Sequence, residues 1–136
     1  MKKLLLALAV VSLTGCSTVE TLKESFLMKY DPNEYAQIAD IRTNSEYFKE
    51  SCDRPQEAQI KANQLVRQTA LFKNQTEFLP YNKKVIASAV ELDAMAQGLV
   101  AQYQKGAVSP AFCKIKFDSI ARSAETIQKT VGAKPR

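Results

Sequence analysis

After residue 30, apolar residues recur at alternating steps of three and four, the spacing of helices that bury one face. The first helix has a start signal: Asp31 at the N-cap, Pro32 at the first helical position and Glu34 at the third. Its expected inward residues are Tyr35, Ile38, Ile41, Ser45, Phe48 and Cys52. Because Pro55 cannot continue a helix, we expect this one to end near Cys52.

A second helix is expected between Pro55 and Pro80. Its inward residues are Ala58, Ala62, Leu65, Thr69, Phe72, Thr76 and Leu79. A third helix is predicted after Asn82, which would cap it, and before Gly106, which suits a helix C-terminus. Its inward residues are Val85, Ala89, Leu92, Ala96, Leu99 and Tyr103.

Ser109 and Pro110 repeat the combination of a capping residue and a proline, and so predict a fourth helix. Its inward residues are Cys113, Phe117, Ile120, Ala124, Ile127 and Val131. No segment alternates with a period of two, and short connections make successive helices antiparallel. We therefore predict an all-α fold, an antiparallel up-down-up-down four-helix bundle over residues 31–131 with a short N-terminal arm. The tail 132–136 lacks an apolar pattern and is expected to be frayed.

The N-terminal segment has the features of an export signal. Lys2 and Lys3 precede an apolar run from Leu4 to Val11, which is shorter than the roughly 20 residues that span a bilayer. Such a run is typical of a secretory signal peptide, which is removed in the mature protein. Residues 1–15 are assigned to it.

Leu13, Thr14, Gly15 and Cys16 follow this run directly. They resemble the lipobox of bacterial lipoproteins, in which an aliphatic residue, a small residue and glycine or alanine precede a cysteine. The resemblance implies that Cys16 is lipidated and that the chain is cut between Gly15 and Cys16. Two or three acyl chains would hold the protein firmly to a bilayer, at about 0.8 kcal/mol per buried CH₂.

In that family an Asp after the cysteine retains the lipoprotein in the inner membrane, whereas this chain has Ser17. The resemblance therefore implies the inner leaflet of an outer membrane, facing the periplasm. Residues 16–30 carry apolar residues on one helical face, among them Val19, Leu22 and Phe26. Three interpretations stay open for this segment: an amphipathic helix in the headgroups, a helix packed on the bundle, or a frayed tether.

Without residues 1–15 the chain keeps 121 residues, enough for one domain with a core of its own. Lys2 and Lys3 leave with the signal peptide, so 17 basic residues face 14 acidic ones and the net charge is +3. This charge is small, and no nucleic-acid-binding motif occurs. We expect no nucleic-acid partner.

Cys52 and Cys113 remain as an even pair in an exported chain, and an oxidising compartment favours a disulfide. In the predicted topology Cys52 ends the first helix and Cys113 begins the fourth, so both lie at the same end of two neighbouring helices. The sequence has no His, so no metal site, no cofactor and no catalytic residue of the Ser-His or Cys-His type is expected.

The chain offers two pairs of neighbouring carboxylates, Glu46 with Glu50 and Glu91 with Asp93, and both are interpreted as parts of solvated faces. Tyr81 with Lys83 and Lys84 would form a basic, aromatic corner on the membrane side of the bundle. It could contact anionic headgroups weakly, or be an ordinary loop.

The segments "DPNEYAQIADIR", "CKIKF", "SIARSAETIQK" and "GAKPR" resemble small lipoproteins of bacterial and phage genomes that have no assigned activity. The sequence thus favours a membrane-anchored periplasmic lipoprotein that is not an enzyme and acts as an interaction or structural module. Its partners would be the bilayer, through acylated Cys16, and an envelope protein. The alternatives are a phage-encoded envelope effector, for superinfection exclusion or lysis, and an inhibitor of an envelope enzyme.

Overall fold

The computed structural model describes residues 19, 22–23 and 27–136. Within this part of the chain the fold is all-α, with long helices α2 (Pro32–Phe48), α3 (Pro55–Glu77), α4 (Lys83–Lys105) and α5 (Pro110–Gly132). A 3₁₀ helix, η1 (Lys49–Asp53), connects α2 to α3. The signal peptide and the lipobox residues Gly15 and Cys16, with Ser17, lie outside the described residues.

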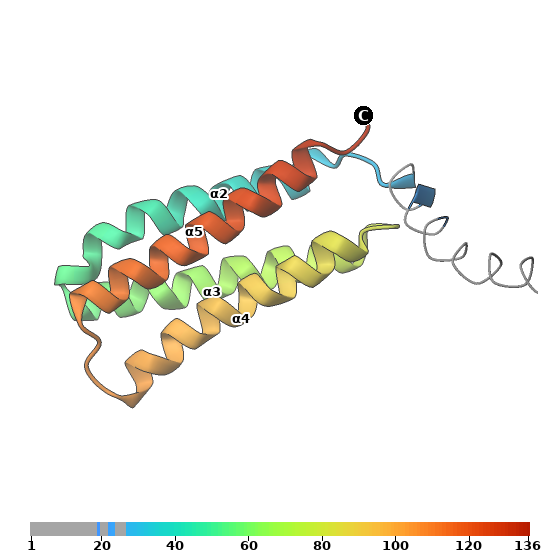
Figure 1. The fold of residues 1–136 in the computed structure, drawn as a ribbon. Coiled ribbons are helices and arrows are strands. Elements are labelled where there is room, and N and C mark those ends of the chain that lie inside the picture. Colours follow the sequence, from blue (N-terminus) through green and yellow to red (C-terminus); the bar gives the residue numbers. More distant parts are fainter. Residues whose placement is uncertain (1–18, 20–21, 24–26) are drawn as a thin grey trace, which may run out of the picture.

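The helices form the predicted antiparallel four-helix bundle (Figure 1). Helix α2 packs against α3 and α5, and α4 packs against the same two helices, so the first and last helices are neighbours. The closest pairings are α2 with α5 and α3 with α4. Each of the three helices of 23 residues is roughly 34 Å long at 1.5 Å per residue.

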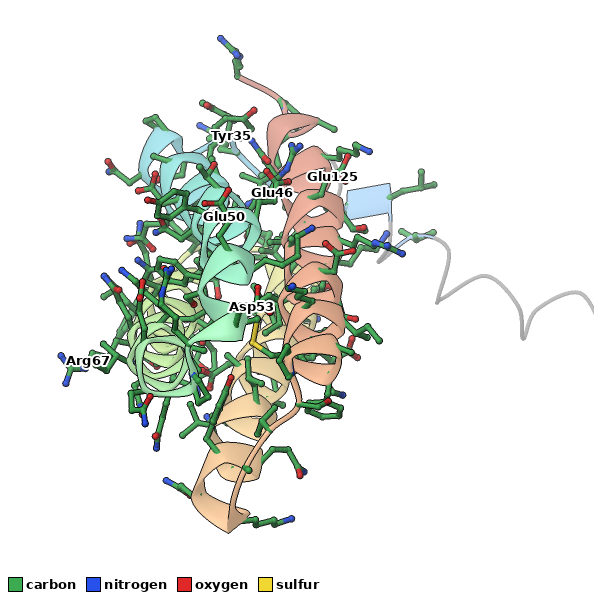
Figure 2. The ribbon with its side chains drawn as sticks, turned by 90° about the vertical axis from the view of Figure 1, so that its left-hand side faces the viewer. Tyr35, Glu46, Glu50, Asp53, Arg67 and Glu125 are labelled. Carbon is green, nitrogen blue, oxygen red and sulfur yellow. A yellow bond between two sulfur atoms is a disulfide. The ribbon has the colours of Figure 1, made fainter. Side chains whose placement is uncertain are left out.

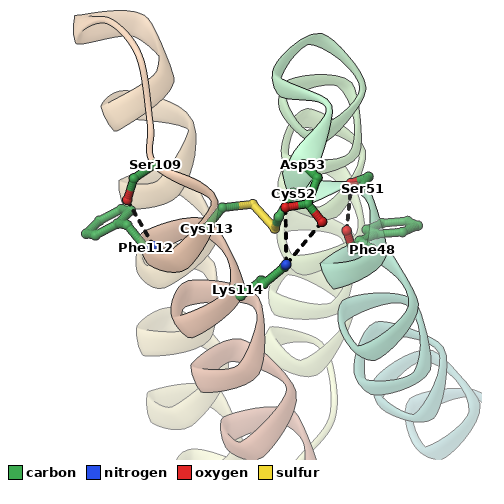
Figure 3. Close-up of a disulfide and its surroundings, with 8 residues drawn as sticks. All are labelled: Phe48, Ser51, Cys52, Asp53, Ser109, Phe112, Cys113 and Lys114. Atoms are coloured by element: carbon green, nitrogen blue, oxygen red, sulfur yellow. Dashed lines mark hydrogen bonds and ion pairs between the residues drawn. A yellow bond between two sulfur atoms is a disulfide. The ribbon is translucent and has the colours of Figure 1, made fainter.

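The bundle has two ends that we name by their contents. The tether end holds residues 28–31, where the chain enters the bundle, together with the α3–α4 turn 78–82 and the tail 133–136 (Figure 1). The disulfide end holds η1 and the α4–α5 loop 106–109 (Figure 3).

Two of the predicted N-caps are confirmed. The Asp31 carboxylate accepts hydrogen bonds from the backbone N–H groups of Asn33 and Glu34, each at 2.8 Å. The Ser109 hydroxyl accepts one from the N–H of Phe112 at 3.2 Å. Gly106 follows α4 with a φ of 146°, a conformation that side chains disfavour, so it ends that helix as predicted.

The first helix ends differently from the prediction. Its α-helical geometry stops at Phe48, and the chain tightens into η1, which carries Cys52. The third predicted cap is wrong in its chemistry. Asn82 occupies the N-cap position of α4, but its side chain makes no capping hydrogen bond because it points into the bundle.

Most of the predicted inward residues are buried and form one continuous core. Phe48 and Phe117 meet edge to face across α2 and α5, with ring centroids 6.2 Å apart. Tyr35 and Leu79 are only half-buried. The neighbour of Tyr35, Glu34, takes the core position instead and is fully buried.

The tail was predicted to be frayed, and the structure contradicts this. The carbonyl of Pro135 accepts a hydrogen bond from the N–H of Tyr30 at 2.9 Å. Lys134 is buried, and Arg136 lies over the ring of Tyr30 with its guanidinium carbon 4.9 Å from the centroid. The tail is held because the buried ammonium of Lys134 has polar partners inside the bundle.

Candidate functional site: the two ends of the bundle and the face of α4

The structure joins the two cysteines that the sequence analysis paired. Cys52 of η1 and Cys113 of α5 form a disulfide with their Cα atoms 5.7 Å apart, and both residues are buried (Figure 3). An ion pair lies beside it, in which the Lys114 ammonium is 3.2 and 3.1 Å from the two carboxylate oxygens of Asp53. The disulfide end therefore fastens α2 and η1 to the start of α5.

The tether end contains a buried polar cluster that the sequence analysis missed. The Asn82 amide donates to one Glu34 carboxylate oxygen at 2.6 Å, and the Lys134 ammonium pairs with the other. Lys134 also donates to the Asn82 side-chain oxygen at 2.7 Å. The three side chains come from α2, the α3–α4 turn and the tail, so this cluster holds those three segments together.

A second buried carboxylate corrects the expectation that Asp93 lies on a solvated face. Asp93 is buried between α3 and α4 and accepts hydrogen bonds from Thr69 at 2.9 Å and Lys73 at 3.1 Å. Gln97 donates to the same carboxylate at 2.8 Å. Glu91, Glu46 and Glu50 are exposed as expected.

The spacing of these buried charged groups could have revealed them. Glu34 lies four residues before Ile38 and continues the inward stripe of α2, and Lys134 lies three residues after Val131, where the spacing of α5 extends past the end of the helix. Asp93 lies four residues after Ala89 in the same way. Both oxygens of Glu34 and both of Asp93 have donors within the protein. These carboxylates therefore stabilise the fold by the pairing that burial of charge requires.

The α3–α4 turn exposes two aromatic side chains. Phe78 is 87% exposed and Tyr81 is 52% exposed. Tyr81 has a φ of 56°, a backbone conformation that is rare for a bulky side chain. Its neighbour Asn82 is pinned inside by Glu34 and Lys134, so the chain must reverse at Tyr81 and the ring faces outward.

Two shallow depressions flank Gly98, which is exposed near the middle of α4. One, of about 500 Å³, lies toward α3 and is lined by Val66 and Ala101 among others. The other, of about 360 Å³, lies toward α5 and includes Met95 and Phe112. A Cβ atom added to Gly98 would meet nothing within 4 Å, so no contact within the bundle requires glycine here.

Several other charged residues form solvated pairs on the helix surfaces. A hydrogen bond from Lys49 lowers the pKa of Asp118, and Arg122 lowers it further. Lys129 lowers the pKa of Glu125 through a hydrogen bond. Arg67 projects from α3 into solvent (Figure 2). Exposed pairs of this kind contribute little to stability because water and salt screen them.

No protein-family model, curated protein or solved structure matches this chain. Among the described residues, no helix combines the length and apolar character needed to cross a membrane. The same residues contain no cluster of three or more His, Cys, Asp or Glu side chains suited to a metal ion.

The disulfide closes a loop of 61 residues, which in the entropy model stabilises the fold by roughly 4 kcal/mol. Reduction should therefore lower the melting temperature measured by circular dichroism. It should leave the helical signal at 20 °C largely intact, because the apolar faces stay buried. The control is Cys52→Ala/Cys113→Ala, whose melting temperature should not respond to reductant. Two titratable thiols at these positions in protein purified without reductant would contradict the disulfide.

Lys134→Met should destabilise the bundle by about 3–5 kcal/mol in urea unfolding, because it leaves the Glu34 carboxylate buried without its ammonium partner. Adding Glu34→Gln should recover part of the loss, since the charge is then gone. The matched control is Lys129→Met, which breaks an exposed pair with Glu125 and should change the stability little. Equal effects of Lys134→Met and Lys129→Met would show that the tail does not hold the tether end.

Proposed function

We propose that this protein is a lipid-anchored periplasmic interaction module that is not an enzyme. In this proposal Cys16 carries the lipid, which inserts into the inner leaflet of an outer membrane, and the bundle faces the periplasm. The lipobox-like residues Leu13 to Cys16 support the anchor, and Ser17 in place of Asp supports the outer membrane. An envelope protein is the partner.

The arrangement of the bundle suits such a role. The arm from Cys16 reaches the bundle at one end, and the helices extend roughly 34 Å from there. A disulfide fastens the far end, so the surfaces of the helices are held in fixed relative positions. A binding surface benefits from this rigidity because less freedom is lost on association.

The observation that carries the proposal is Gly98. Glycine inside a helix costs about 0.8–1 kcal/mol relative to alanine, and nothing in the bundle fills the space beside it. A glycine that the fold does not need is explained if another molecule approaches the backbone closely at this point. The depressions on either side, with Val66, Met95 and Phe112, offer apolar contacts to such a partner.

The anchor is tested with Cys16→Ala, which should not be labelled by radioactive palmitate in cells. Globomycin should cause the full-length precursor of the unaltered protein to accumulate. Ser17→Asp is the matched variant, because it keeps Cys16 and should still be labelled while moving to inner-membrane fractions. Normal processing and labelling of Cys16→Ala would refute the anchor. Unaltered protein in the inner membrane would refute the localisation.

The binding surface is tested by placing a photoreactive residue at Gln97 or Gln102, which flank Gly98, in the anchored protein. Both positions should form an adduct with the same envelope protein on irradiation. Gly98→Leu should reduce the adduct tenfold or more, because central contacts of an interface are each worth roughly 2 kcal/mol or more. As the control, the photoreactive residue is placed instead at Arg67, on an exposed face of α3, where it should give no such adduct.

Gly98→Ala separates this role from a structural one. It should stabilise the isolated fold by about 0.8–1 kcal/mol, because the added methyl group meets no neighbour. A destabilised Gly98→Ala would show that the fold itself needs this glycine. Adducts that form equally with Gly98→Leu would place the partner elsewhere on the bundle.

A further inference from the structure

The seven residues from Phe78 to Lys84 differ in three ways from what is usual in a turn between two helices. Phe78 is the most exposed large apolar side chain described, at 87%, although it directly follows α3. Tyr81 adopts a positive φ that disfavours a bulky residue. Lys83 and Lys84 occupy the first turn of α4, where the helix dipole favours acidic side chains and none is present.

The positive φ of Tyr81 and the two lysines in the first turn of α4 each cost stability. A non-glycine residue with a positive φ is strained and persists only where its surroundings hold it. Here the holding group is Asn82, which is bonded inside to Glu34 and Lys134. The buried cluster thus presents Phe78 and Tyr81 outward on a rigid turn.

The charge around this turn is mainly positive. The exposed basic side chains of the tether end are those of Lys29, Lys83, Lys84 and Arg136. Its acidic side chains are Glu77, which is exposed, and Asp31, which is half-buried and caps α2. Glu34 and Lys134 neutralise each other inside. Aromatic rings beside lysines are the combination found where proteins meet the headgroup layer of a membrane.

The position of the turn favours a membrane as its binding surface. Met28 lies 12 positions after Cys16, a span of at most about 43 Å when extended and about 18 Å as a helix. The α3–α4 turn lies at the end where this arm enters, because Asn82 and Tyr30 are joined through the tail residues Lys134 and Pro135. The arm therefore keeps the turn within a few tens of ångströms of the lipid.

We infer that the turn 78–84 docks on anionic phospholipid headgroups of the bilayer that holds Cys16. In this inference, which rests on the proposed lipid anchor, Phe78 and Tyr81 enter the headgroup layer. Lys83 and Lys84 pair with phosphate groups. The bundle then stands with its tether end on the membrane and carries the Gly98 face away from the lipid.

The chain contains no tryptophan, so one introduced indole reports on one position. Mature lipidated protein carrying Phe78→Trp is reconstituted on vesicles of phosphatidylglycerol and phosphatidylethanolamine. Its emission should shift to shorter wavelength and be quenched by brominated acyl chains. The matched control is Tyr47→Trp, which replaces an aromatic residue that is 64% exposed near the C-terminus of α2. The emission of Tyr47→Trp should neither shift on the vesicles nor be quenched by brominated acyl chains.

Flotation of the same samples separates this inference from the anchor. Protein that floats with the vesicles while Phe78→Trp behaves like Tyr47→Trp would overturn the docking and leave the anchor standing. Protein that does not float would overturn the anchor. Docking is then decided with the mature chain carrying Cys16→Ser, which has no lipid and must bind the vesicles without an anchor.

In that unlipidated chain, Lys83→Ala and Lys84→Ala should each weaken binding to the anionic vesicles roughly five-fold. Phe78→Ser should weaken it further, and vesicles of phosphatidylcholine alone should bind poorly. Lys114→Ala at the disulfide end removes the same charge and should have little effect. Equal losses from Lys84→Ala and Lys114→Ala would overturn the inference, because the attraction would then come from net charge and not from the turn.

Discussion

The pairing of the first helix with the last closes this bundle, and the rest of the fold depends on it. The other neighbouring helices are joined by short connections, so loop geometry alone brings them together. Helices α2 and α5 have no such connection, and bringing them together costs loop entropy. The chain fastens this pair at both ends, by the Cys52–Cys113 disulfide and by the ion pair between Glu34 and Lys134.

The two fastenings differ in their physical nature. The disulfide acts mainly by restricting the unfolded chain, so it stabilises the bundle without specifying much of its local structure. The polar cluster acts in the folded state, where each buried partner must meet the others in one geometry. Because it includes Asn82, it also determines the shape of the α3–α4 turn. The tether end is thus the end whose exact conformation is specified.

The sequence predicts the architecture well because its signals are local and agree with one another. Three prolines begin helices, Gly106 ends one, and the apolar stripes continue over several turns. The disulfide follows from the topology, since both cysteines fall at one end of neighbouring helices. The polar cluster was missed because Glu34 fits a helix N-terminus equally well, and because its partners are 48 and 100 residues away. The spacing marks Glu34 as an inward residue, but only the fold shows which distant residues pair with it.

Most residues of this bundle follow the usual preferences for helix formation, backbone conformation and charge at helix ends. The few residues that do not are therefore informative. Gly98 weakens α4, Tyr81 strains the turn, and Lys83 with Lys84 opposes the helix dipole. Gly98, Lys83 and Lys84 have no compensating contact among the described residues, whereas the polar cluster around Asn82 holds Tyr81 in place. The buried charges Glu34 and Asp93 are likewise paired. Residues that cost stability without improving the fold are best explained by contacts outside it. Under the proposed function these exceptions mark two separate surfaces, the turn 78–84, which would face the lipid, and the face of α4 around Gly98. The closed α2–α5 pair fixes the positions of these two surfaces relative to each other.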